Sequence, residues 1–176
     1  AAKAGESFRN GGSEVGAVLP SGAAGVAAGA EPSAVEASLA QVLATVSRAS
    51  AVVDKVDGDL ARDAALARSV LSGLQTTGHG LLTHAGRGLT SVDRLAANVG
   101  VPSGTIVRVI DERPDPKSIS LALDRAALEA RKSGSAIVFG HSRPETVQSF
   151  FQWVFSGAAA QVDLAPVSAV ITAPPS

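Results

Sequence analysis

Polar residues follow several apolar stretches of the chain at the point where each stretch ends. His141 and Arg143 come directly after "SAIVFG", and Asp111 comes directly after "TIVRVI". Earlier in the chain, His84 lies near the end of "HGLLTHA" and Asp54 follows "SAVV". Because buried strands of α/β folds carry their chemistry at the carboxyl ends, these residues are candidates for a functional site.

Side chains of these types suit two kinds of chemistry. Imidazole and carboxylate groups are ordinary ligands of Zn²⁺, and a bound metal lowers the pKa of its water to about 7. Histidine also acts as a general acid or base without a metal. Arginine can hold a carboxylate, a phosphate or a developing oxyanion. We therefore predict a metal-assisted or acid–base reaction on a polar substrate.

A purely structural role is the alternative for the same positions. Strand ends meet water, so Asp57 and Glu112 are more typical of helix caps and solvated loops, and "GHSRPE" also fits a cap followed by a turn. Ser33 and Ser142 lie at capping positions, and no GxSxG elbow supports either of them as a nucleophile. The chain also lacks the glycine patterns of Walker and Rossmann nucleotide sites.

The elements that must position these side chains alternate between strand and helix. Apolar runs predict strands at residues 14–20, 50–55, 79–85, 105–111, 135–141 and 161–171. Helical spacing fills the gaps between them. After His141, for example, apolar residues recur at i, i+3, i+4, i+7 and i+8, namely Val147, Phe150, Phe151, Val154 and Phe155. This alternation predicts an α/β fold with a parallel sheet.

In such a sheet all strands point the same way, so the residues that follow them gather at one rim. The predicted rim consists of Asp54, Lys55 and Asp57, His84 and Arg87, Asp111 and Glu112, and His141, Ser142 and Arg143. Two histidines, several carboxylates and two arginines at one rim indicate a site for a polar substrate.

Start and stop signals divide these elements further. Ser33 with Glu36, and Ser142 with Glu145, have the spacing of a capping box. Asp115 is followed by Pro116, which predicts an N-cap and a first helical residue. Three glycines follow predicted helices, as C-terminal caps do, namely Gly78, Gly100 and Gly134. Residues 20–34 are rich in small residues and predict a flexible loop, and 172–176 predict a tail.

Composition limits the class of protein. The 176 residues fit one domain, which we place at residues 1–171. Fifteen basic and sixteen acidic residues give a net charge of −1 without a basic cluster, which argues against a nucleic-acid partner. No run of residues is long and apolar enough for a membrane span. Cysteine and methionine are absent, even at position 1, so we expect the natural start to lie upstream.

Two long segments resemble a known family. "VIDERPDPKSISLALDRAALEARKSGSAIVFGHSRPETVQSFFQW" and "VDLAPVSAVI", preceded by "GHGLLTHAGRGLTSVDRLAANVGVP", are similar to the divergent polysaccharide deacetylases of the bacterial envelope. The resemblance implies a partial or distorted (β/α) barrel, with its first strand or strands upstream of this chain. It also implies export to the periplasm or cell envelope, and ancestry among metal-dependent enzymes that remove acetyl groups from sugars.

The resemblance assigns roles residue by residue. His141 and Arg143 match the family's GH-x-RP element, and Asp111 matches its acidic residue after a strand. In "DKVDG", however, Asp54, Lys55 and Val56 stand where the family has two asparagines and a histidine. His84 stands where relatives have an aspartate.

From the resemblance and the rim we predict three groups of site residues. The catalytic residues are His141, Arg143, His84 and Asp111, the metal ligands are His84 and Asp54, and the substrate-binding residues are Arg87 and Asp57. The predicted cofactor is a divalent metal such as Zn²⁺.

Two functions from different classes follow. The first is an exported deacetylase-like hydrolase that acts on acetylated envelope carbohydrate with a degenerate metal site. The second is an inactive barrel that binds a glycan or an envelope protein. Because open sheet edges must be covered, a polypeptide partner is also expected.

Overall fold

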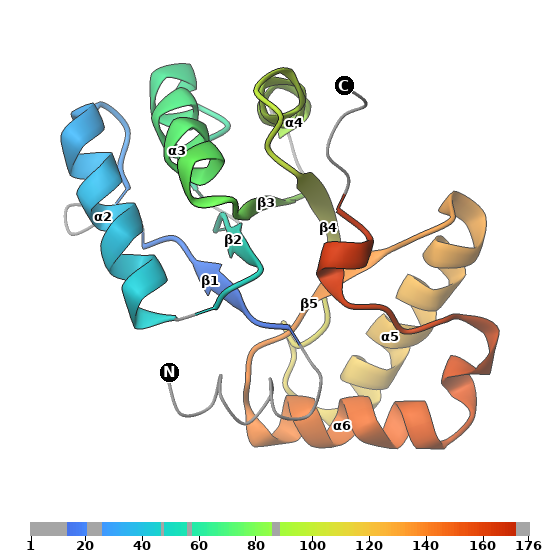
Figure 1. Cartoon of the computed structure of the whole chain (residues 1–176). Helices are drawn as coiled ribbons and strands as arrows, with labels where there is room; N and C mark the ends of the chain where they lie inside the picture. Colours follow the sequence, from blue (N-terminus) through green and yellow to red (C-terminus); the bar gives the residue numbers. More distant parts are fainter. Residues whose placement is uncertain (1–13, 21–25, 47, 56–57, 86–88, 172–176) are drawn as a thin grey trace. The chain divides into compact units, whose positions relative to one another are not determined.

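The computed structural model describes residues 14–20, 26–46, 48–55, 58–85 and 89–171 (Figure 1). Its strands are β1 (Gly16–Val18), β2 (Ala51–Val53), β3 (Gly80–His84), β4 (Ser103–Val109) and β5 (Ile137–Phe139). Its α-helices are α2 (Pro32–Thr45), α3 (Ala64–Thr77), α4 (Leu89–Asn98), α5 (Pro116–Ser133) and α6 (Pro144–Phe155). Two 3₁₀ turns follow, η1 (Ala158–Gln161) and η2 (Val167–Ala169).

Strand and helix alternate along the described chain, as the apolar runs predict. The strands occur in the order β1-β2-β3-β4-β5, and the pairs β1–β2, β2–β3 and β4–β5 are parallel. Parallel neighbours need a crossover connection, which the intervening helices supply. The predicted fold class, an α/β fold of parallel βα repeats of the partial (β/α) barrel class, is confirmed.

The chain forms two compact units. The first contains residues up to Thr105 together with 166–171, and the second contains Ile106–Ala165. Strand β4 begins in the first unit and ends in the second. The prediction of one domain over residues 1–171 stays a prediction.

The core of the first unit lies between its strands and the helices α2, α3 and α4, which lie side by side in Figure 1. Helix α3 contributes most to it, with Leu66, Ala67, Val70, Leu71 and Leu74 buried. This helix has well-defined ends: Asp63 accepts hydrogen bonds from the backbone of Ala65 and Leu66, and Gly78 closes it with a φ of 74°.

The core of the second unit lies between α5 and α6. Its buried members are Ile110, Ile119, Leu123 and Trp153. The indole Nε1 of Trp153 donates a hydrogen bond of 2.7 Å to Asp124 Oδ1 on α5. As the sequence predicts, Asp115 caps α5 by accepting from Ser118 N, with Pro116 at the first turn.

The prediction of a strand at residues 161–171 is wrong. The segment ends η1, continues in extended backbone and forms η2, whose N-cap is Pro166. Proline lacks the N–H that a strand ladder needs, and its fixed φ favours the start of a helical turn. Glu14 in turn holds η2, because its carboxylate accepts hydrogen bonds from the backbone and hydroxyl of Ser168.

The two predicted capping boxes are also wrong. Helices α2 and α6 begin at Pro32 and Pro144, and neither N-cap residue, Glu31 or Arg143, forms a side-chain cap. Because proline has its φ fixed and no N–H to satisfy, it starts a helix without help from a capping serine. The glycines 78, 100 and 134 do have positive φ, as C-terminal caps should.

Of the segment predicted as the 20–34 loop, the structure describes Pro20 and residues 26–34. Val26 is buried in the core of the first unit, and Asp63 accepts a hydrogen bond from Gly29 N. Helix α2 then begins at Pro32, inside the predicted loop. The predicted 172–176 tail lies outside the described residues. None of the helices described here combines the length and apolar character that crossing a bilayer requires.

Candidate functional site

The candidate site of the second unit is at the carboxyl ends of β4 and β5. A bulge at Val107 shifts the register between the two strands, so Arg108 and Val109 pair with Val138 and Phe139. Ile110 N then donates to Phe139 O at 2.8 Å. This pairing places Asp111 beside Gly140 and His141, although thirty residues separate them in sequence.

Gly140 permits this close approach. A Cβ at this position would lie 3.0 Å from Ile110 Cγ1 and 3.1 Å from Thr146 Cγ2. These distances are shorter than ordinary van der Waals contact, so a side chain here would require Ile110 or Thr146 to shift by a few tenths of an ångström. Glycine therefore lets the end of β5 lie close to Ile110 and Thr146.

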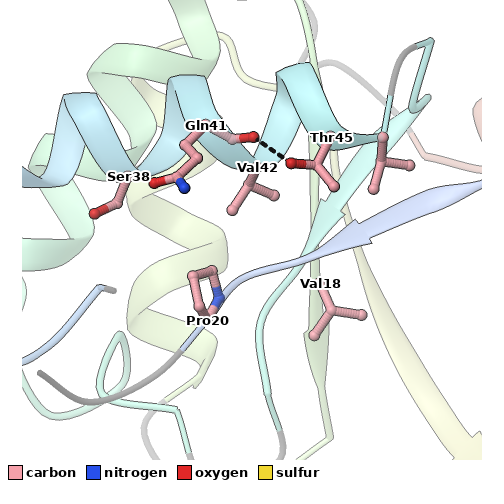
Figure 2. A pocket seen from close by; sticks show the side chains of 7 residues that line it. Val18, Pro20, Ser38, Gln41, Val42 and Thr45 are labelled. Atoms are coloured by element: carbon pink, nitrogen blue, oxygen red, sulfur yellow. Dashed lines mark hydrogen bonds between the residues drawn. The ribbon is translucent and has the colours of Figure 1, made fainter. Parts of the chain in front are cut away.

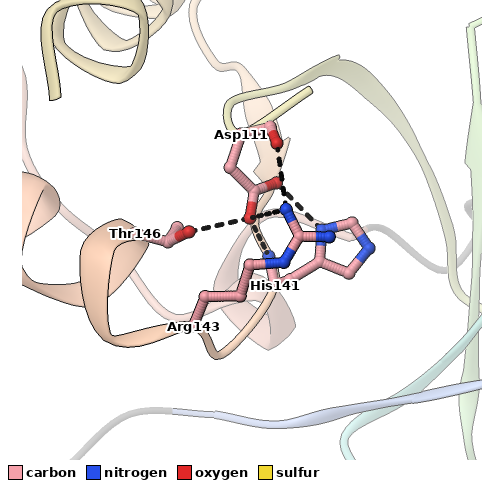
Figure 3. Close-up of polar contacts among 4 residues, drawn as sticks. All are labelled: Asp111, His141, Arg143 and Thr146. Carbon is pink, nitrogen blue, oxygen red and sulfur yellow. Dashed lines mark hydrogen bonds and ion pairs between the residues drawn. The ribbon is translucent and has the colours of Figure 1, made fainter. Parts of the chain in front are cut away.

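Asp111 is the centre of the site and is only 1% exposed (Figure 3). Its Oδ2 accepts hydrogen bonds from His141 N at 2.9 Å and from Thr146 Oγ1 at 2.8 Å. Its Oδ1 lies 2.9 Å from His141 Nδ1. Burial alone raises the pKa of the Asp111 carboxyl, but the hydrogen bonds from His141 and Thr146 outweigh burial and hold the pKa below its ordinary value.

The contact with Asp111 orients the ring of His141. A carboxylate can only accept, so Nδ1 carries the proton in this pair and Nε2 is the acceptor of the neutral ring. The Phe139 ring meets the imidazole edge-on at 5.2 Å between centroids. The His141 side chain is 49% exposed, and Figure 3 shows its second ring nitrogen pointing away from Asp111. This is the geometry of an acid–base histidine held by a buried carboxylate.

Arg143 adds a positive charge next to this pair. Its Nη1 donates to Asp111 O at 3.4 Å and lies 4.0 Å from Asp111 Oδ2. The Arg143 side chain is about half exposed, and Nη1 is the guanidinium atom that contacts Asp111. It can therefore hold an anion or a developing oxyanion near His141.

Two predicted site residues belong to the first unit. His84 ends β3 and is partly buried, and burial lowers the pKa of its imidazole below the ordinary value. Asp54 follows β2 and is buried, and burial raises the pKa of its carboxyl to about 6. The Asp54 carboxyl packs directly on Gly58, where a Cβ would come within 2.0 Å of its Oδ1. Each residue is thus in an environment that favours its neutral form.

Asp54→Asn is expected to stabilise the protein by about 3 kcal/mol at pH 7. A pKa raised to about 6 means that the folded state binds the proton more tightly than the unfolded state, whose carboxyl ionises near 3.8. Stability therefore falls as the pH rises from 4 to 6, and the penalty is complete above 6. Thermal melts of wild type and Asp54→Asn should coincide at pH 4 and separate by pH 7.

Glu36→Gln is the control for this prediction, because Glu36 is exposed on α2 and should not alter the pH profile. Equal melting temperatures for Asp54→Asn and wild type at pH 7 would contradict the burial argument.

The donor set does not fit a metal site within the described residues. There, no group of three or more histidine, cysteine, aspartate or glutamate residues is gathered so that it could hold an ion. Both carboxylate oxygens of Asp111 already accept hydrogen bonds from His141 and Thr146. Asp54 and His84 remain a sequence-based prediction as ligands, and no step below depends on a metal.

The sequence-predicted residues thus divide into three groups. The structure brings Asp111, His141 and Arg143 together in the second unit. Asp54 and His84 follow β2 and β3, neighbouring strands of the first unit. Asp57 and Arg87, predicted to bind substrate, lie outside the described residues.

Two supporting residues of the site, Thr146 and Phe139, are not predicted from the sequence. Thr146 is buried in the first turn of α6 and donates to Asp111, although it occupies a position where an apolar core residue would be expected. A threonine three residues after Arg143 does not by itself indicate a hydrogen-bond donor to Asp111, because the sequence does not show that the two residues are neighbours. Phe139 has the pattern of an ordinary strand residue, so its ring contact with His141 is not predicted either.

A groove of about 270 Å³ runs between β1 and α2 in the first unit (Figure 2). Its lining consists of Val18, Pro20, Ser38, Gln41, Val42, Thr45 and Val46. None of these lining residues is titratable, and the Val18 side chain is 41% exposed. The groove therefore offers packing surface rather than chemistry.

The fold and the aspartate–histidine pair define an α/β domain with polar groups at the ends of parallel strands. The profile of the divergent polysaccharide deacetylase family matches residues 15–171, and the chain belongs to this family. It is a deacetylase-like domain.

A crystal structure of an uncharacterized protein from Agrobacterium tumefaciens C58 has the same fold. It superposes with a TM-score of 0.79 at 20% sequence identity, over 93% of this chain and 70% of that chain. Among curated proteins, none matches the chain at a significant level.

Proposed function

We propose that this domain is an exported, deacetylase-like hydrolase that acts on acetylated carbohydrate of the bacterial envelope. The Asp111–His141 pair supports this proposal most directly. In this pair the Asp111 carboxylate is buried and its pKa lies below the ordinary value. It forms a hydrogen bond with the half-exposed imidazole of His141 and so orients the ring. Membership of the deacetylase family supports acetylated carbohydrate as the proposed substrate class.

In this proposal each residue has one role. Nε2 of His141 transfers the proton, either from the attacking water or to the sugar atom that leaves the acetyl group. Asp111 is a positioning residue that keeps Nδ1 protonated and the ring fixed. Arg143 stabilises the negative charge that develops on the acetyl oxygen. Asp54 and His84 are included only as sequence-based candidates for ligands of a divalent metal such as Zn²⁺.

The alternative proposal is a glycan-binding or scaffolding module without catalysis. It is supported by the lack, within the described residues, of any three-ligand group. It is also supported by β1, which is the last strand at one edge of the sheet among the described residues and borders the groove on α2. An extended polypeptide could add to such an edge, and an envelope protein is the proposed partner.

His141→Gln tests the hydrolase proposal. The glutamine side chain can still accept or donate hydrogen bonds but cannot transfer a proton at neutral pH, so acetate release should fall about a hundredfold. The assay measures acetate released from acetylated oligosaccharides, with and without added Zn²⁺. Ser142→Ala, an exposed neighbour, should retain wild-type rates.

Equal rates for His141→Gln and wild type would exclude His141 as the acid–base residue. A wild-type protein that binds acetylated oligosaccharides but releases no acetate under either condition would instead support the binding module.

A further inference from the structure

The outward face of α6 carries an uninterrupted stripe of four exposed residues. They are Pro144, Gln148, Phe151 and Phe155, which recur at i, i+4, i+7 and i+11 and so lie on one side of the helix. The opposite side packs into the core through Thr146, Ser149 and Trp153. The helical spacing places Phe151 and Phe155 on one apolar face with Phe150, which would pack on the sheet, but the structure exposes both side chains.

The two exposed phenylalanine rings form an ordered pair. Phe151 is 48% exposed and Phe155 is 82% exposed. Their rings are stacked, with centroids 6.2 Å apart and planes inclined by only 15°. Phe150, which packs against the core, meets Phe151 edge-on at 5.8 Å and supports it from behind. The pair is therefore an exposed aromatic surface in which the two ring planes are nearly parallel.

The chemistry of the stripe indicates an uncharged ligand with flat apolar faces. From Pro144 to Phe155 the helix carries one charged residue, Glu145, and no basic residue. A nucleic acid or an anionic membrane surface would require clustered Lys or Arg. Gln148 lies between Pro144 and the two rings and offers both hydrogen-bond donors and an acceptor. Aromatic faces beside an amide suit the ring faces and hydroxyls of a neutral sugar.

We propose that Phe151, Phe155 and Gln148 form a glycan subsite that continues the site at His141. This inference rests on the proposed function. The stripe continues the proposed site because it starts at Pro144, next to Arg143 and two residues after Ser142. With a rise of 1.5 Å per residue, the rings lie about 10 and 17 Å along the helix axis from Pro144. A single sugar at His141 would not reach them, whereas a chain of several sugars would.

The experiment compares binding of N-acetylglucosamine and its β-1,4-linked hexamer by isothermal titration calorimetry. For Phe155→Leu, and for Phe151→Leu, we expect the Kd of the hexamer to rise about five- to tenfold, because a stacked ring is replaced by an aliphatic side chain. Phe155→Tyr should bind like wild type. The Kd of the monosaccharide should not change in any variant.

Leu128→Ala is the matched control, since Leu128 is an equally exposed apolar residue on α5. It should leave hexamer binding unchanged. Because all these side chains are exposed, circular dichroism melts should coincide with those of the wild type.

If Phe151→Leu and Phe155→Leu both bind the hexamer as tightly as the wild type, the proposed subsite is overturned. A wild type that does not bind the hexamer would also overturn it. A change of oligomeric state in sedimentation, with unchanged binding, would identify the stripe as a contact between copies and overturn it as well. Acetate release by His141→Gln is measured separately, so failure of the hydrolase proposal and failure of the subsite remain distinguishable.

Discussion

Asp111→Ala is expected to lower the free energy of unfolding by about 3 to 5 kcal/mol, more than any other substitution in the site. Asp111 is buried and accepts hydrogen bonds from His141 N, His141 Nδ1 and Thr146 Oγ1. Truncation to alanine leaves the buried Thr146 hydroxyl and the His141 N–H without their acceptor and removes the negative charge that faces Arg143. Each buried group that loses its partner keeps the full cost of its desolvation.

The measurement is urea unfolding followed by the fluorescence of Trp153, the one tryptophan of the chain, which lies in the same unit. Glu112→Ala is the matched control, because Glu112 is the next residue and is exposed. It should change stability by less than about 0.5 kcal/mol. Asp111→Asn keeps one acceptor oxygen and should lie between the two. An Asp111→Ala variant as stable as Glu112→Ala would show that the network does not stabilise the fold.

The pH dependence of this effect has a definite sign. The folded-state pKa of Asp111 lies below 3.8, the value of the unfolded chain, so the carboxylate stabilises the protein fully above pH 4. That contribution is lost as the pH falls through the folded-state pKa. Wild type and Asp111→Asn should therefore converge in stability below pH 4, and the wild type should be the more stable of the two at higher pH. The sign is opposite for Asp54, where the asparagine variant is expected to be the more stable at pH 7.

Trp153→Ala is expected to have an effect of similar size, about 3 to 5 kcal/mol. The indole is buried among Ile110, Ile119 and Leu123, and its Nε1 donates at 2.7 Å to Asp124 on α5. Alanine would leave a cavity between α5 and α6 and would also remove the hydrogen bond that joins them.

Unfolding of the Trp153 variants must be followed by circular dichroism, because they lack the fluorescent residue. Trp153→Phe fills most of the space and loses the hydrogen bond, so it should cost about 1 to 2 kcal/mol. Phe155→Ala, on the outward side of the same helix, should be nearly neutral. A Trp153→Ala variant as stable as Phe155→Ala would contradict the assignment of the buried face of α6.

This contrast on α6 shows where sequence patterns stop being sufficient. Apolar residues occur on both sides of α6, with Phe151 and Phe155 on the outward side and Phe150 and Trp153 on the side that packs into the core. Periodicity identifies the helix but not which face is buried. Packing against α5 decides which face is buried, because Trp153 lies among Ile119 and Leu123 of α5 and its indole donates a hydrogen bond to Asp124.

Local chemistry was sufficient for most of the architecture. The strands β1 to β5, the Asp115 cap and the glycine caps follow from apolar runs, side-chain oxygens at helix starts and the freedom of glycine at positive φ. These are short-range effects. The predictions from these effects were wrong where a proline determines the local structure. Pro166 begins a 3₁₀ turn where a sixth strand was predicted, and Pro32 and Pro144 begin helices where capping serines were predicted.

The candidate site shows the same division. Residue types and their positions after strands were enough to select Asp111, His141 and Arg143 from the sequence alone. Only the tertiary structure decided that Asp111 is buried, that Thr146 completes its hydrogen bonds and that His141 is fixed by Nδ1. The physical reason is that burial and hydrogen-bond geometry depend on β4 and β5 lying side by side, across the bulge at Val107. Such a pairing between segments thirty residues apart leaves no local pattern in the chain.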